Sequence, residues 1–184
     1  MANGAISPED VRVGRLILAT TRESIGSFGR RNTILGTILL YVPLAVSIGA
    51  SVSRGELTVS HVRNTVSNLL EATTVDDTID FYRALWLVSP KGDLNKQVDE
   101  WTEKHDRFDI YNPHLFENIL EDGLTLSQLL KQSAGVDRIC REIAYRYPTA
   151  LGPLLDRLRS EMSGVDDAEE AIVSVFLWQL AAEP

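Results

Sequence analysis

Two arginines and an asparagine stand at the start of the longest uncharged stretch of the sequence, where they could bind phosphate. Arg30, Arg31 and Asn32 come directly before segment 33–53, which contains no charged residue. At the N-terminus of a buried helix, the helix dipole and the guanidinium groups would act together on an anion. Gly36 would let a ligand or a second helix approach the backbone. The alternative is that Asn32 only caps the helix, Gly36 permits helix packing and both arginines are solvated.

Aspartates in the middle of the sequence could hold Mg²⁺ or act as a base. Asp76 and Asp77 are adjacent, and Asp80 follows one turn later on the same predicted helix. Carboxylate oxygens are ligands that Mg²⁺ prefers, and a carboxylate can also accept a proton from a reacting hydroxyl. The run 74–77, Thr-Val-Asp-Asp, is also typical of a helix start, in which the acid caps the backbone. The cap is the favoured interpretation.

Three further residues could contact a phosphorylated ligand. Asp109 belongs to an irregular, polar segment, 88–112, and a connection this long inside a compact domain is usually functional or mobile. Lys91 lies in a turn of the same segment and could bind phosphate, although lysines are common in surface turns. Arg138 follows Asp137 at a predicted helix start, where an ion pair is as good an explanation as a ligand contact.

The elements that must position these residues are helices. Apolar residues recur at helical spacing through most of the chain, and no strand-like alternation of useful length occurs. The sequence therefore predicts an all-α, single-domain bundle of about eight helices over 1–184, with a loose terminus at 1–7. Segment 33–53 is predicted to be its buried axial helix. A single membrane span at 33–53 is the minority interpretation, because Pro43, two glycines and several hydroxyls dilute its apolar character.

Composition narrows the class of protein. The chain has 184 residues, of which 44% are hydrophobic and 24% charged, as in an ordinary soluble domain. Its net charge of -8 speaks against a general nucleic-acid or anionic-membrane binder. The single cysteine, Cys140, excludes an internal disulfide framework and a cysteine-based zinc site. With no secretion signal evident, a cytoplasmic location is expected.

A series of short motifs runs in order through most of residues 11–150. They are Asn32-Thr33-Ile34-Leu35-Gly36, Leu39-Leu40, Pro43-Leu44-Ala45, Thr74-Val75-Asp76-Asp77, Tyr82-Arg83-Ala84, Pro90-x-Gly92, Asp109-Ile110, Leu124-Thr125-Leu126 and Asp137-x-Ile139. In this order they resemble the archaeal and bacterial relatives of triphosphoribosyl-dephospho-CoA synthase, which makes the prosthetic-group precursor of citrate and malonate acyl carrier proteins.

The resemblance implies a transferase that joins ribose C1 of ATP to the ribose 2'-hydroxyl of dephospho-CoA and expels adenine. Such a reaction needs cations for the phosphates, Mg²⁺ held by carboxylates and a base. The implied catalytic residues are Asp109 and Asp77, and the implied Mg²⁺ ligands are Asp109, Asp76 and Asp77. The implied nucleotide-binding residues are Arg30, Arg31, Asn32, Thr33, Gly36, Lys91 and Arg138.

The sequence also departs from the family pattern. Nothing upstream of Asn32 supplies the family's Pro-Lys-Pro-Gly-type loop, its glycine-rich segment reads here as 90–94, Pro-Lys-Gly-Asp-Leu, and the chain ends about where the family continues. The expectation is therefore the middle and later part of a family member, truncated or naturally short. The alternative is a non-catalytic helical binding or assembly subunit. A homo-oligomer, or a partner that covers the missing terminal regions, is expected in either case.

Overall fold

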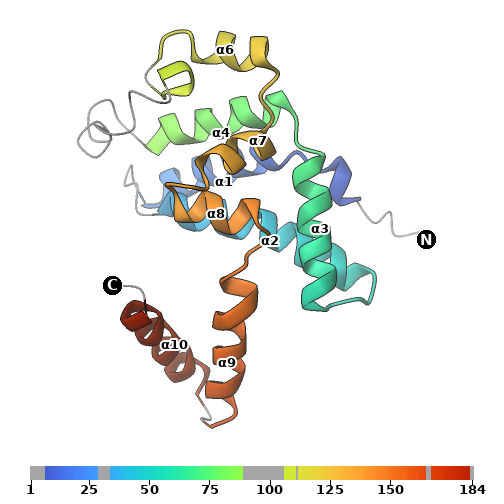
Figure 1. Ribbon diagram of the computed structural model, residues 1–184, viewed down its shortest axis with the longest axis vertical. Helices are drawn as coiled ribbons and strands as arrows, with labels where there is room; N and C mark the ends of the chain where they lie inside the picture. The colour runs from blue at the N-terminus through green and yellow to red at the C-terminus, as the bar shows by residue number, and fades with distance from the viewer. Residues whose placement is uncertain (1–6, 29–33, 89–105, 111, 165–166, 183–184) are drawn as a thin grey trace.

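The chain is described here from a computed structural model, which places residues 7–28, 34–88, 106–110, 112–164 and 167–182; Figure 1 draws the rest as a grey trace. Within these ranges the secondary structure is helical with no strand, which confirms the predicted all-α class. In chain order the elements are η1 (Pro8–Asp10), α1 (Val13–Phe28), α2 (Leu35–Ser53), α3 (Val59–Glu71), α4 (Val75–Val88), η4 (Asp106–Phe108), α6 (Leu115–Asp122), α7 (Leu126–Ser133), α8 (Arg138–Ala144), η5 (Ala150–Leu154), α9 (Leu155–Met162) and α10 (Ala168–Ala182). The expectation of a single domain over 1–184 stays a prediction.

Helix α2 is the apolar helix predicted at 33–53. It packs against α1, α3 and α8. The buried hydroxyls of Ser47 and Ser51 donate to carbonyls one turn earlier, those of Pro43 and Ser47, at 2.9 and 2.7 Å. Among the described helices, α2 alone is long and apolar enough to cross a membrane. Of its most apolar 18-residue stretch, 33% is buried inside the protein. Its three helical neighbours favour the interpretation as a core helix.

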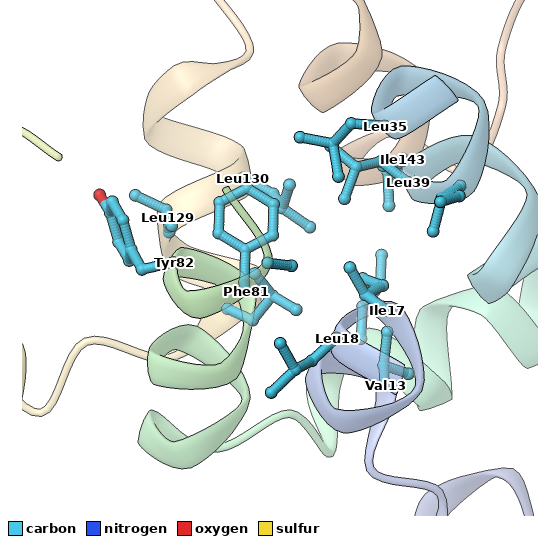
Figure 2. Close-up of a cluster of buried hydrophobic side chains, with 14 of the residues drawn as sticks. Val13, Ile17, Leu18, Leu35, Leu39, Phe81, Tyr82, Leu129, Leu130 and Ile143 are labelled. Carbon is cyan, nitrogen blue, oxygen red and sulfur yellow. The ribbon is translucent and has the colours of Figure 1, made fainter. Parts of the chain in front are cut away.

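The hydrophobic core forms where α1, α2, α4, α7 and α8 meet (Figure 2). Each large apolar side chain that leaves water here contributes about 1.5–3 kcal/mol to folding. Tyr82 lies at the edge of this cluster, beside Leu129 (Figure 2). The labelled core side chains are Val13, Ile17, Leu18, Leu35, Leu39, Phe81, Tyr82, Leu129, Leu130 and Ile143.

Helices α9 and α10 form a hairpin that extends away from the rest of the molecule (Figure 1). The hairpin follows α8 through η5, and α10 packs mainly on α9. No residue of α9 is buried, and Ala171 is the one buried residue among the described side chains of α10. The hairpin therefore contributes little to the core.

Candidate functional site

Asp77, in the first turn of α4, is buried, and its carboxylate joins α4 to α1. Oδ1 accepts hydrogen bonds from Gly14 N at 3.0 Å and Arg12 Nε at 3.3 Å. Oδ2 accepts from the backbone N–H and the hydroxyl of Thr74, both at 2.9 Å. A carboxylate offers about four lone-pair sites, so these protein donors can fill them. A metal ion at Asp77 would have to displace one of these donors.

Gly14 allows α1 and α4 to approach closely enough for this contact. A Cβ atom at residue 14 would lie 2.1 Å from the backbone oxygen of Asp77, and its nearest neighbours are all backbone atoms of that residue. Backbone cannot move aside as the end of a flexible side chain can. The residue at position 14 is therefore restricted to glycine by the packing of the two helices.

Asp76 and Asp80 make separate contacts. Asp76 is exposed and lies 3.6 Å from Arg12 Nη2, whereas Asp80 accepts a hydrogen bond from Arg83 at 2.9 Å. Among the described residues, no three histidine, cysteine, aspartate or glutamate side chains gather as a metal site. The predicted Mg²⁺ ligands thus do not form an all-protein cage there. Mg²⁺ is usually held by one or two carboxylates together with phosphates and water, so a Mg²⁺ ligand at Asp109 stays a prediction.

Asp109 lies in a short segment whose backbone is bound by side chains of α4 both before and after this residue. The Tyr82 hydroxyl donates to the carbonyl of Phe108 at 2.7 Å. One turn further along α4, Trp86 Nε1 donates to the carbonyl of Ile110 at 2.9 Å. Residues four apart share one face of a helix, so both donors reach the same stretch of backbone. The backbone is consequently held by α4 at the residues on either side of Asp109.

Arg107 ties the same segment to α6. Its guanidinium donates to Asp122 at 2.7 Å and to Glu121 at 2.5 Å, and its carbonyl accepts from Asn118 Nδ2 at 2.9 Å. Hydrogen bonding to the guanidinium lowers the pKa of Asp122. Exposed ion pairs add little stability, so the main effect of the bonds from Arg107 to Asp122 and Glu121 is to orient the segment on α6. Asp109 is thereby held between α4 and α6.

Tyr82 and Cys140 are two ionisable side chains whose pKa values depend on burial and on nearby carboxylates. Burial raises the pKa of Tyr82, and the negative charge of Asp109 raises it further. Burial, followed by the charge of Asp137, also raises the pKa of Cys140. The backbone N–H of Cys140 donates to Asp137 Oδ1 at 2.7 Å, which makes Asp137 the N-cap of α8. Tyr82 and Cys140 are therefore protonated at neutral pH.

The start of α8 also lies against the start of α2. A Cβ atom at position 36 would be 2.7 Å from Ile139 Cδ1, so Gly36 serves close helix packing. Arg138, the preceding residue, is exposed. The structure thus brings Gly36 to the start of α8, where Arg138 lies, whereas Asp77 contacts α1 and the Asp109 segment is held by α4 and α6.

Several predicted site residues, together with most of segment 88–112, lie outside the described residues. They are Arg30, Arg31, Asn32, Thr33 and Lys91. Sequence reasoning missed the roles of Tyr82 and Trp86 in holding the Asp109 segment, and of Arg12 and Gly14 in binding Asp77. The one signal in the sequence was that Tyr82 and Trp86 are four residues apart, which places both aromatic side chains on one face of a helix.

Comparison with known proteins supplies the family. The family model for CitG, described as ATP:dephospho-CoA triphosphoribosyl transferase, matches residues 1–184. The match therefore extends beyond residues 11–150, whose motifs carried the resemblance. No curated protein and no solved structure matches the chain. Since the family model covers the whole sequence, the chain belongs to the ATP:dephospho-CoA triphosphoribosyl transferase family.

Proposed function

We propose that this protein binds ATP beside Asp109 and transfers its triphosphoribosyl group to dephospho-CoA. The bond between ribose C1 of ATP and adenine breaks, and adenine leaves with the bonding electron pair. A new bond forms between C1 and the ribose 2'-oxygen of the acceptor, whose proton passes to a base and then to adenine. The triphosphate stays on the product. The family match supports this choice of donor and acceptor.

The observation that carries the proposal is the fixed position of Asp109. Its flanking carbonyls are held by Tyr82 and Trp86, and Arg107 fastens the segment to α6. A carboxylate on a backbone held in this way is suited to bind Mg²⁺ together with the ATP phosphates, and the ion would neutralise phosphate charge. Arg138, at the start of the nearby α8, is the proposed guanidinium contact for the triphosphate.

The residues outside the described ranges complete the proposed nucleotide site. Arg30, Arg31, Asn32 and Thr33 precede α2 and Gly36 in the sequence, and Lys91 belongs to the segment before Asp109. Asp77 receives a structural role in this proposal, because four protein donors already bind its carboxylate. The cytoplasm is the expected location, since ATP is the proposed substrate.

Adenine release tests the proposal. Purified protein is incubated with ATP, Mg²⁺ and dephospho-CoA, and free adenine and the triphosphoribosylated product are measured by liquid chromatography. We expect both to form in equal amounts, and Asp109→Ala to slow their formation at least about a hundredfold. Asp76→Ala removes an exposed carboxylate on the α1 side and serves as the matched control. Equal rates in wild type and Asp109→Ala would refute the assignment of Asp109.

A second candidate is a non-catalytic helical binding or assembly subunit that keeps the family core. The exposed apolar side chains of α10 favour it, because such surfaces usually bind another protein. A folded protein that neither binds ATP nor releases adenine would support this candidate over the transferase.

A further inference from the structure

Helix α10 carries a row of apolar side chains that the described part of the chain leaves uncovered. Each of the five residues in this row is 55–58% exposed. At 100° per residue they fall within an arc of about 140° on the helix, which we call the apolar face. Ala171, on the opposite side, is buried where α10 packs on α9. The apolar face consists of Ile172, Val173, Phe176, Leu177 and Leu180.

The apolar face is large enough to form a stable interface. Its five side chains expose on the order of 600 Å². A standard interface buries about 800 Å² on each partner. Soluble monomers rarely leave so large a contiguous apolar area in water. The apolar face of one copy thus provides most of the area that one side of a dimer needs.

The distribution of charge makes α10 a surface that a second copy can approach. The chain carries a net charge of -8, so two copies repel each other over most of their surface. Helix α10 has no charged residue after Glu170. If the two α10 helices pair antiparallel, the first-turn acids Glu169 and Glu170 of the two copies lie at opposite ends. The apolar faces then meet without bringing like charges together.

The spacing of the row suits helix-to-helix packing. Val173, Phe176 and Leu180 follow one another at intervals of three and four residues, which keeps them on one seam between packed helices. We propose that the apolar face of α10 binds the same face of a second copy, so that two α10 helices pack against each other across a two-fold axis, with α9 on the outer side of each. The hairpin and η4 lie at opposite ends of the molecule (Figure 1), so this dimer leaves the Asp109 segment accessible.

Sedimentation velocity on the full chain tests the dimer, over a roughly hundredfold range of micromolar concentrations. We expect wild type to have twice the mass of one chain. The double variant with Phe176→Glu and Leu180→Glu is expected to have the mass of one chain, a twofold loss, with an unchanged helical circular dichroism spectrum. Leu120→Glu is the matched control, because Leu120 is 61% exposed on α6, and it is expected to stay dimeric.

Three results would overturn the proposal. They are a wild type of single-chain mass throughout the range, a dimer that the double variant leaves intact, and a control that dissociates equally. If the double variant loses its helical spectrum, hydrogen exchange of wild type decides instead. Amides of α10 that are protected in concentrated solution and exchange faster after dilution support the dimer; exchange that does not depend on concentration refutes it.

Discussion

The carboxylate of Asp77 accepts a hydrogen bond from the backbone N–H of Gly14 at 3.0 Å, and this contact joins the starts of α4 and α1. Sixty-three positions separate the two residues in the sequence. The aspartate that resembles a metal ligand in the sequence thus links two helices of the core. The role of Asp109 in substrate chemistry does not depend on this contact and stays a prediction.

Gly14→Ala should destabilise the protein, because the new Cβ would meet the backbone oxygen of Asp77 at 2.1 Å. Forcing α1 and α4 apart should lower the free energy of unfolding by about 1–3 kcal/mol or more. The matched control is Gly49→Ala in α2, where a Cβ meets nothing within 4 Å. Since alanine favours helix over glycine by about 1 kcal/mol, the control should be neutral or stabilising. Urea denaturation measures both, and equal effects would contradict the packing described.

Asp77→Ala should cost stability whether or not nucleotide is present. It leaves the buried backbone N–H of Gly14 and the partly buried N–H of Thr74 without their acceptor, and a buried unsatisfied donor costs about 1–3 kcal/mol. Asp76→Ala, at an exposed carboxylate with one long ion pair, should change the free energy of unfolding by less than about 0.5 kcal/mol. An Asp77→Ala protein as stable as wild type but without activity would instead indicate a catalytic role for Asp77.

Stability should fall at alkaline pH. Burial raises the pKa of Tyr82 above its ordinary value of 10.0 in the folded state. The unfolded chain therefore loses the proton first, so the contribution of Tyr82 is fully present below pH 10 and is lost as the pH rises through the folded pKa. Tyr82→Phe should lower stability at neutral pH by about 1 kcal/mol and flatten the alkaline decline. Denaturation curves between pH 7 and about pH 11 measure the stability of wild type and variant. Tyr41→Phe, at an exposed side chain, is the control. Parallel declines of stability in all three proteins would refute the role of Tyr82.

The thiol of Cys140 should react slowly in the folded protein. Burial and the charge of Asp137 raise its pKa, and the thiolate is the reactive form. Alkylation by iodoacetamide at about pH 8 should be at least tenfold slower than in urea-unfolded protein. Mass spectrometry of the modified chain follows the rate. Equal rates in the folded and unfolded protein would show that the thiol is neither buried nor held protonated.

The sequence predicted much of the fold, because helical periodicity and the uncharged segment before Arg54 are local signals. The run 74–77 likewise predicted a helix start, and Thr74 and Asp77 do bind each other there. The contact between Asp77 and Gly14 was beyond prediction, since a close helix crossing depends on tertiary packing. The same holds for the backbone carbonyls on either side of Asp109, because side chains on α4 locate them and no local pattern reports such a contact.

Calorimetric titration with ATP, in the presence and absence of Mg²⁺, tests the central claim most directly, because binding precedes turnover. The wild type should bind ATP with Mg²⁺ and at least tenfold more weakly without it. Asp109→Ala should lose the Mg²⁺-dependent part of the affinity, whereas Asp76→Ala should retain it. Circular dichroism confirms that each variant is folded. Mg²⁺-dependent binding that survives in Asp109→Ala, or no ATP binding by folded wild type, would contradict a nucleotide site at Asp109.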